Sequence, residues 1–573
     1  MAKNSLARTT RPLTKPESIK HLINIAVAEA GDKVAFKYRS GNDIVEVTYK
    51  QFQEHTFWLG TAIKSLGMES AHIGCCGENS YDWIMTYLSA LQTEGVFCPI
   101  DKELPESDLI NVIDGGDDEI VFCDKKREGI FKNIREQLPK VKYFVCFDRE
   151  EDEGEFLSFK KLVQKGKEIF ESGDRSFLDL ETKDRHALKM LLYTSGTTGI
   201  AKGVMLTEHN LCSLIYYGLR LSSFRDVSLS ILPYHHSFEA VAGILASIHH
   251  QSTLCVNDSL KRVLKNMAVF KPGHMLVVPA IVEIMYRKII ANIEEKGKTK
   301  LIKVAIKLSR FLRAVGIDAR RKIFKEIHDA FGGNLEKLIC GSAPLRPEVA
   351  DFFDDIGILL TNGYGITECS PLVSGNTDYD NDPRTVGGWI ECIDLRIDNP
   401  NEDGEGEICV KGDTVMLGYY KNPEATAEVF DEDGYFHTGD YGKVNEKKQL
   451  LITGRKKNII ILGNGKNIYP EELENYIGNI PYALESVVYA LRDAVGHESE
   501  LCAECIVDPK FMEGSSLEEK VAKLKNDIFK ALEKLPTYKQ IKNVKIREIP
   551  FIKTTTNKIR RAKDGSPLNE EEK

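Results

Sequence analysis

The chain has 573 residues and a mass of 64.5 kDa, enough for roughly three or four folding units or for one large domain and a smaller one. Hydrophobic residues make up 42% and charged residues 28%, which excludes a disordered, collagenous or coiled-coil chain. The net charge of −9 argues against nucleic-acid binding. The 13 cysteines lack the dense spacing of a secreted scaffold, so a reducing cytoplasm is expected.

The first half of the chain alternates helical and strand-like segments. Helical periodicity predicts helices over 18–30 and 82–93, and short apolar runs predict strands over 71–75, 119–123 and 143–147. Strands that alternate with helices predict a mainly parallel sheet with both faces covered. No stretch approaches the roughly 18 unbroken apolar residues of a membrane span, and the basic, polar N-terminus lacks the apolar core of a signal peptide.

The second half of the chain differs from the first in its predicted secondary structure. Residues 283–330 are typical of long amphipathic helices. From Asn401 onward, glycine and turn residues separate short strands, which predicts an antiparallel β subdomain. After Gly454 a smaller α/β unit is expected to run to the end of the chain. Cys502 and Cys505 form a lone C-x-x-C within a strand-like run, where residues three apart face opposite sides, so no zinc or redox site is expected there.

The most informative segment is YTSGTTGIAKGV, residues 193–204. Its tyrosine, serine and threonines supply hydroxyl donors, and its glycines let backbone N–H groups approach an anion closely. Lys202 adds a positive charge, so the segment combines what a polyphosphate requires. No Walker loop can be placed on it. A Ser/Thr/Gly run is often an ordinary surface loop, but the preceding apolar strand and the lysine favour phosphate binding.

Two further segments carry polar groups suited to a nucleotide. In TNGYGITECSP, residues 361–371, Tyr364 can stack on a base, Thr367 can contact a phosphate and Glu368 can hold Mg2+ through a hard oxygen ligand. In HTGD, residues 437–440, Asp440 follows a tight turn and can bind both hydroxyls of a ribose. Each of these residues, taken alone, would usually be solvated surface or an ordinary turn.

Together, the motifs resemble those of the adenylate-forming superfamily, which includes acyl-CoA synthetases, peptide-synthetase adenylation domains and firefly-type luciferases. The resemblance extends from about residue 18 to residue 561, and four more blocks match in order: LPYHHSFE, CGSAPL, ITGRKKNIIILGNGKNIYPEELE and PFIKTTTNKIRR. Residues 277–289, residues 331–353 and the TECSP ending make the chain most similar to long-chain fatty acid–CoA ligases. So many ordered motifs outweigh the false-positive risk of each.

The resemblance implies an α/β fold. A large N-terminal domain of parallel sheets and helices with a β subdomain, residues 1–454, would carry the nucleotide site. A small mobile C-terminal α/β domain, residues 455–573, would carry the catalytic lysine. It also implies a two-step reaction in which ATP and a carboxylic acid give an acyl adenylate and pyrophosphate, and coenzyme A then displaces AMP to form a thioester. Since adenylation joins two anions, the protein must neutralise charge at the reacting centre.

Family roles transfer to matching positions of this sequence. Glu368 would bind Mg2+, and Lys558 would bridge the carboxylate and the α-phosphate, with Thr198 and His236 as further catalytic positions. Arg455 would contact the nucleotide and Asp440 the ribose. The remaining nucleotide-binding positions, in the phosphate loop and the adenine pocket, would be Thr194, Ser195, Gly196, Thr197, Thr198, Lys202, Gly341, Asn362, Gly363, Tyr364 and Thr367.

The sequence departs from the family pattern next to the catalytic lysine. Asn557 replaces the glycine that commonly precedes it, and asparagine tolerates a left-handed backbone better than most residues do. Lys457 falls at the family's domain hinge. Rotation there would withdraw Lys558 after adenylation and bring the loop around Gly465 to the thiol site.

The acyl site is less well specified by sequence. Phe238, Val278, Ala343 and Ile366 are expected acyl-pocket walls, while His236 is as well explained as an ordinary core residue. None of them defines a chain length.

Residues 287–325 contain 13 Lys or Arg and three Asp or Glu, a local net charge of +10. This segment could dock on an anionic membrane or an acidic acyl carrier protein, or it is a solvated helix face. An acyl-acyl carrier protein synthetase, a ligase for another carboxylic acid and a non-catalytic nucleotide-binding module remain alternatives to the fatty acid–CoA ligase.

Overall fold

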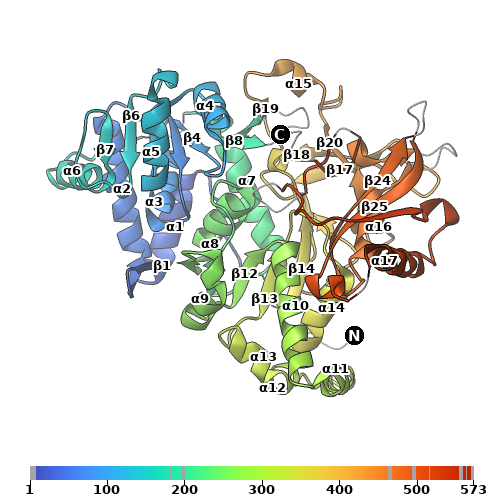
Figure 1. The fold of residues 1–573 in the computed structure, drawn as a ribbon. Coiled ribbons are helices and arrows are strands. Elements are labelled where there is room, and N and C mark those ends of the chain that lie inside the picture. The colour runs from blue at the N-terminus through green and yellow to red at the C-terminus, as the bar shows by residue number, and fades with distance from the viewer. Residues whose placement is uncertain are drawn as a thin grey trace.

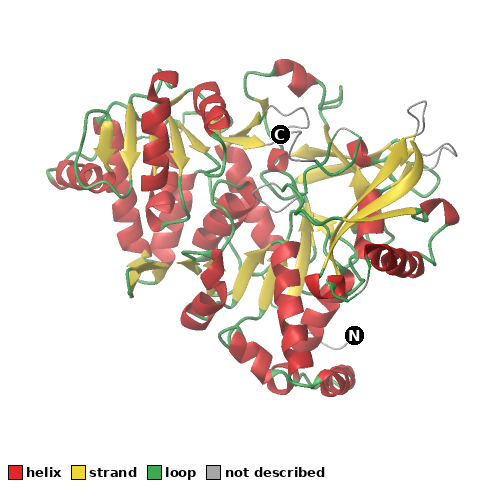
Figure 2. Cartoon of the chain, in the orientation of Figure 1, coloured by secondary structure: helices red, strands yellow, loops and turns green. Residues whose placement is uncertain are grey.

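The computed structural model describes residues 8, 10–180, 183–194, 201–461, 467–492, 498–514, 516–553, 559–562 and 564–568. Two large sheets and a small one form the N-terminal part, and a separate three-stranded sheet forms the C-terminal part (Figure 1). The strands of both large sheets are flanked by helices (Figure 2). This mixed α/β architecture, with a large N-terminal domain of mainly parallel sheets and a smaller C-terminal domain, confirms the predicted fold class.

The first large sheet has eight strands. From β8 to β7 all neighbours are parallel, whereas β9 and β19 add antiparallel strands at one edge. In spatial order the strands are β19 (Gly418–Tyr419), β9 (Lys202–Thr207), β8 (Leu188–Thr194), β4 (Val96–Pro99), β3 (His72–Cys76), β5 (Asp118–Cys123), β6 (Tyr143–Cys146) and β7 (Phe156–Ser158).

Helices connect and cover these strands. They are α1 (Ile19–Ala30), α2 (Tyr49–Ser65), α3 (Tyr81–Leu91), α4 (Glu106–Gly115), α5 (Lys125–Ile134) and α6 (Phe159–Glu171). The helix predicted over 18–30 is confirmed as α1, which begins after Ser18, whose side chain accepts a hydrogen bond from the backbone N–H of His21. The helix predicted over 82–93 is α3, and the three predicted strands are β3, β5 and β6, each within two residues of its predicted bounds.

The second large sheet has nine strands and is parallel at its centre. In spatial order they are β16 (Gly388–Trp389), β15 (Ser374–Gly375), β14 (Leu359–Tyr364), β13 (Lys337–Cys340), β12 (His274–Val277), β10 (Val227–Ser230), β11 (Thr253–Val256), β1 (Val34–Ser40) and β2 (Asp43–Thr48). Its helices are α7 (Glu208–Leu221), the π-helix η2 (Phe238–Leu245), α8 (Ala246–His250), α9 (Val263–Phe270), α10 (Pro279–Glu295), α11 (Thr299–Ala314), α12 (Arg320–Ile323), α13 (Lys325–Ala330) and α14 (Pro347–Ile356).

The prediction of long helices over 283–330 is correct only for α10 and α11. Gly316, with φ of +86°, ends the helical run after α11, because a left-handed residue cannot continue a right-handed helix. Two short helices, α12 and α13, follow it. Among the described residues, no helix combines the length and apolar character needed to cross a bilayer.

The β subdomain predicted from Asn401 is confirmed as an antiparallel sheet of β17 (Ile393–Asp398), β18 (Gly406–Gly412), β20 (Phe436–Val444) and β21 (Leu450–Arg455). The C-terminal part contains β22 (Ile460–Ile461), β23 (Asn467–Ile468), α16 (Pro470–Ile477), β24 (Ala483–Arg492), β25 (Glu498–Val507), α17 (Leu517–Ala531) and β26 (Asn543–Ile546).

The apolar cores also separate along the chain. One buried cluster extends from Ile19 to Leu450, and another contains residues from Ile460 to Ile541. Cys502 and Cys505 of β25 belong to different clusters, on opposite faces of the strand, as the spacing predicted. The two halves therefore fold around their own cores, and the segment between Leu450 and Ile460 connects them.

Candidate functional site

A cavity of about 960 Å³ lies where the two large sheets, the β subdomain and the C-terminal part meet. The carboxyl ends of β13 and β14 form its floor, the place where ligands bind in open α/β sheets. Its lining changes from polar to apolar. The polar part includes residues of β14, η4 (Thr367–Cys369), β20 and η5 (Lys456–Asn458), and the apolar part includes residues of α7 and η2.

A chain of polar contacts closes one side of the polar part. The Tyr364 hydroxyl donates to Asp440 Oδ2 at 2.7 Å, and Arg455 Nε donates to Asp440 Oδ1 at 2.9 Å. Asp440 is buried, and its carboxylate raises the pKa of Arg455. Burial raises the pKa of Tyr364 well above its usual range, so its hydroxyl keeps its proton. Tyr364 and Arg455 line the cavity, and Asp440 lies directly behind them.

Glu368 and Thr367 place oxygen atoms beside this group. Both line the cavity. Tyr419 donates its hydroxyl to Glu368 Oε1 at 3.1 Å, and the Thr367 hydroxyl lies 3.5 Å from that of Ser237. Burial raises the pKa of Glu368, because water no longer solvates its charge fully. A carboxylate and a hydroxyl facing one cavity are hard oxygen donors, the type that Mg2+ prefers, so the residues present fit that ion.

Asn362 presents an unusual polar atom. Its side chain is buried, and its Oδ1 has no hydrogen-bond partner within the described part of the chain. A buried acceptor left unpaired costs about 1–3 kcal/mol, and Asn362 lines the cavity beside Gly341 and Gly363. A Cβ added at Gly341 would lie 3.3 Å from Phe238 Cζ, so glycine leaves space on this side of the cavity that a larger residue would fill. The arrangement suits a flat ring with an amino donor.

The phosphate segment is only partly described. Thr194 at the end of β8 and Lys202 at the start of β9 both line the cavity, and they pair across the antiparallel ladder. The Lys202 ammonium lies 4.8 Å from the centre of the Tyr419 ring, a cation–π contact. Ser195, Gly196, Thr197 and Thr198 lie outside the described residues.

The apolar part of the cavity is lined mainly by aliphatic side chains. They come from α7, η2 and the central strands of the second sheet, and include Leu214, Ile215, Leu219, Ala242, Ala246, Leu276, Ile339 and Leu372. Phe238 and Ile366, two of the expected acyl-pocket walls, line the cavity. Val278 and Ala343 do not: Val278 is buried in the core just before α10, and Ala343 lies in an exposed turn.

His236 stands between the polar and apolar parts of the lining. It lines the cavity, and its Nδ1 accepts a hydrogen bond from the backbone N–H of Phe238 at 3.2 Å. In the neutral ring this contact places the proton on Nε2.

The C-terminal part contributes to the same cavity. Lys457, Lys553 and Arg560 line it, and Lys456 donates to Glu407 Oε2 at 2.7 Å across the connecting segment. Lys558 and Gly465 lie outside the described residues, but Lys553 and Arg560 are the neighbours of the Lys558 segment along the chain. Positive charge from the C-terminal part therefore faces the polar end of the cavity.

Sequence reasoning did not single out Tyr419, Ser237, Lys456 or Lys553. Tyr419 lies 51 residues after its partner Glu368 and has no motif of its own. The Asp101–His235 pair at 3.6 Å also joins distant segments. For His235 a signal was present, because it stands in the LPYHHSFE block next to His236.

The chain is similar to known enzymes over most of its length. The family model described as AMP-binding enzyme matches residues 24–420. The chain belongs to the AMP-binding enzyme family. The long-chain-fatty-acid–CoA ligase 5 of Rattus norvegicus is 30% identical over 482 residues, which cover 79% of this chain and 70% of the relative. The long chain acyl-CoA synthetase 4 of Arabidopsis thaliana is 29% identical over 475 residues, covering 77% and 70%.

Solved structures agree on the fold of this AMP-binding enzyme. The crystal structure of ATP-bound MatB from Rhodopseudomonas palustris superposes with a TM-score of 0.72 over 95% of this chain and 97% of that chain. Its sequence identity is 21%, so the likeness concerns the fold alone. The matched family region contains Thr194, Lys202, Gly341, Asn362, Tyr364 and Glu368, whereas Asp440 and Arg455 lie beyond it.

Proposed function

We propose that this AMP-binding enzyme is a fatty acid–CoA ligase, which activates a fatty acid with ATP through an acyl adenylate and then forms a thioester with coenzyme A. One observation carries the proposal: a single cavity joins a polar end suited to a nucleotide to an aliphatic end suited to an acyl chain. The similarity to ligases named for long-chain fatty acids supports the substrate class.

The polar end would hold ATP by its ring, ribose and phosphates. Asn362 Oδ1, which is buried without a partner, would accept a hydrogen bond from the adenine amino group. Asp440 would bind the ribose hydroxyls. Its two carboxylate oxygens contact Tyr364 and Arg455, and each oxygen would accept a further hydrogen bond from the ribose. Thr194 and Lys202, with the intervening Ser195, Gly196, Thr197 and Thr198, would enclose the β- and γ-phosphates.

Charge neutralisation is the main chemical task at the reacting centre, because the attacking carboxylate and the α-phosphate are both anionic. Lys558 would supply a cation between them, and Thr367 would donate to a phosphate oxygen. Mg2+, held by Glu368, would supply further positive charge to the phosphates. His236 would lie next to the acyl carbonyl, between the two ends of the cavity.

The C-terminal part would act as a mobile domain that serves the two steps in turn. We place its boundary at residues 454/455 and its hinge at Lys457, next to the Lys456–Glu407 ion pair. Separate apolar cores on the two sides of this segment support the division. Rotation about it would remove Lys558 and bring the loop around Gly465 to the thiol, which is a gating role. The same thiol site would define whether coenzyme A or an acyl carrier protein accepts the acyl group.

Lys558→Ala tests this enzyme assignment against a non-catalytic binding module. The variant is expected to bind ATP like the wild type but to lose pyrophosphate release by at least about 100-fold, because one electrostatic donor to a transition state contributes about that much. Lys542→Ala is the matched control, since Lys542 is an exposed lysine of the same C-terminal part. Unchanged product formation by Lys558→Ala would contradict the role of that lysine.

We also propose that residues 287–325 contact an anionic membrane from which a fatty acid substrate is taken up. Helix α11 lies at the outer edge of the molecule beside α12 (Figure 1). Five apolar side chains form a stripe along it and its C-cap at intervals of three and four residues, each at least half exposed: Leu301, Val304, Leu308, Phe311 and Val315.

The cations of α11 divide between two tasks. Arg310 and Arg313 pair with Asp355 and Asp354 of α14, so they hold the helix to the body of the protein. Lys300, Lys303 and Lys307 are exposed, and each can contribute about 1 kcal/mol of attraction to an anionic surface. The segment is strongly positive in a chain of net charge −9, so its charge complements an anionic lipid surface.

Vesicle flotation tests this membrane contact. The wild type is expected to float with vesicles that contain phosphatidylglycerol and not with phosphatidylcholine alone, and Phe311→Glu is expected to abolish flotation. Phe529→Glu is the matched control, because Phe529 of α17 is also more than half exposed but lies in the C-terminal part. Binding that is indifferent to lipid charge, or that survives in Phe311→Glu, would contradict the proposal. We also propose that the protein is located in the cytoplasm, which its 13 unpaired thiols support.

A further inference from the structure

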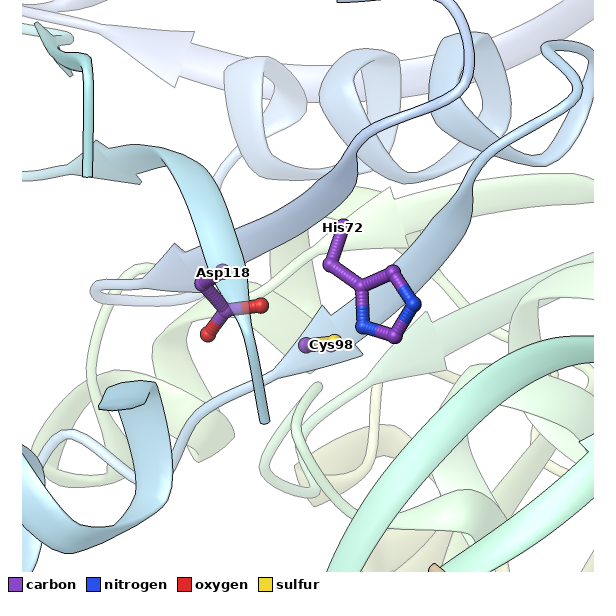
Figure 3. Close-up of side chains that lie close together, drawn as sticks. All are labelled: His72, Cys98 and Asp118. Atoms are coloured by element: carbon purple, nitrogen blue, oxygen red, sulfur yellow. The ribbon is translucent and has the colours of Figure 1, made fainter. Parts of the chain in front are cut away.

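Three side chains from neighbouring strands meet on one face of the eight-stranded sheet. His72 begins β3, Cys98 lies in β4 and Asp118 begins β5. The parallel register places His72 opposite Asp118, and Gly74 opposite Cys98. One ring nitrogen of His72, the Cys98 sulfur and one Asp118 oxygen all lie within 4.8 Å of one another. Figure 3 shows them converging, with Cys98 between the other two in this view.

Asp118 is the feature that needs an explanation. It is fully buried, and apart from the adjacent Cys98 thiol, neither of its carboxylate oxygens has a hydrogen-bond partner among the residues described. The nearby ammonium groups of Lys140 and Lys421 pair with Asp117 instead. A buried carboxylate without a cation or donor is strongly unfavourable.

The backbone leaves space for this carboxylate. A Cβ added at Gly74 would lie only 3.0 Å from Asp118 Oδ2, so a larger residue there would press on the oxygen. The Gly116 carbonyl oxygen accepts a hydrogen bond from His72 Nδ1 at 2.6 Å, so the neutral ring carries its proton on Nδ1. His72 itself is only partly buried, so the cluster can be reached from that side.

We propose that His72, Cys98 and Asp118 bind a zinc ion. Imidazole nitrogen, thiolate sulfur and carboxylate oxygen are the three ligand types of Zn2+ in proteins, whereas Mg2+ and Ca2+ prefer oxygen alone. One thiolate and one carboxylate balance the two positive charges, which makes the bound site electrically neutral, as a buried position requires. A water molecule completes a tetrahedral set. Binding displaces the protons of Cys98 and Asp118 to solvent.

This site is separate from the nucleotide cavity, because none of the three side chains lines that cavity. The ion would join β3, β4 and β5 across the middle of the sheet, so its role is structural. Stability and metal content, rather than ligase activity, are therefore the direct measurements. The proposal does not depend on the identity of the acid or the thiol.

The first experiment measures zinc in the full-length protein, purified without a chelator and then gel-filtered after incubation with Zn2+. The wild type is expected to retain about one zinc per chain, and its melting temperature is expected to fall when the ion is chelated. Cys98→Ser is expected to retain little zinc. Cys123→Ser is the matched control, because Cys123 is a fully buried thiol of β5 in the same sheet, and it should retain zinc like the wild type.

A second measurement needs no variant. The wild-type protein loaded with Co2+ is expected to show a thiolate-to-cobalt charge-transfer band, together with the intense visible bands of tetrahedral cobalt. Substoichiometric zinc with no charge-transfer band would overturn the proposal and leave a protonated Asp118 bonded to the Cys98 thiol. Zinc that is retained equally by Cys98→Ser would overturn it as well, since the ion would then lie elsewhere.

Discussion

Gly218 of α7 offers a direct test of how the apolar end of the cavity limits the acyl chain. It lines the cavity opposite Leu372, and a Cβ added there would lie 3.6 Å from Leu372 Cδ2, an ordinary contact. A Cβ at Gly218 therefore fits without backbone movement, and Gly218→Leu adds four carbon atoms at the cavity wall, in space that a long acyl chain would occupy. At about 0.8 kcal/mol per buried methylene, displacing four methylenes costs roughly 3 kcal/mol, or about 200-fold in kcat/KM.

The assay compares kcat/KM for a series of saturated acids of increasing length in the wild type and in Gly218→Leu. Long acids are expected to lose about 200-fold, while acids too short to reach Gly218 keep their wild-type values. Gly129→Leu is the matched control, since a Cβ at Gly129 of α5 meets nothing within 4 Å and this residue does not line the cavity. An unchanged ratio of long-acid to short-acid activity would show that the acyl chain does not lie between α7 and Leu372.

Three further predictions concern the polar residues. Because burial raises the pKa of Glu368, activity should fall with acidification at a higher pH than an ordinary glutamate would give. Mg2+ competes with the proton for the Glu368 carboxylate, so added Mg2+ should shift this loss of activity to lower pH. A pH–rate profile insensitive to Mg2+ would count against Glu368 as its ligand. Tyr364→Phe removes the donor to Asp440 and should lower kcat/KM for ATP about 10- to 100-fold, as expected for about 1.5–3 kcal/mol; an unchanged value would contradict the site. Lys337→Met removes the nearer of the two cations beside the buried Asp378 and leaves Arg225 at 3.7 Å. It should lower the free energy of unfolding by about 3 kcal/mol in denaturant titrations, and a loss below about 1 kcal/mol would refute this.

Most of the fold could be predicted from local patterns in the sequence. The helical periodicity of residues 18–30 and the apolar runs of β3, β5 and β6 depend on neighbouring residues, so they could be predicted from the sequence. The break after α11 was less visible. Gly316 interrupts an otherwise helical pattern, and only its left-handed backbone shows that the helix ends there.

The candidate site was predictable where its residues belong to short motifs, and less so where they meet through the fold. Glu368 and Tyr364 stand in one motif, and both line the cavity. Tyr419 reaches Glu368 from a strand far along the chain, a contact without a local sequence signal. Val278 was an expected acyl-pocket wall; it is buried just before α10 and does not line this cavity, and apolar character alone does not distinguish a pocket wall from a core residue.

The most direct test of the central claim is pyrophosphate release by the purified protein with ATP, Mg2+ and a panel of carboxylic acids, with and without coenzyme A. Release is expected only with long-chain acids, and AMP formation is expected to continue only when coenzyme A is present. Pyrophosphate release without turnover that depends on coenzyme A would indicate that an acyl carrier protein accepts the acyl group instead. No release with any acid would contradict the ligase assignment.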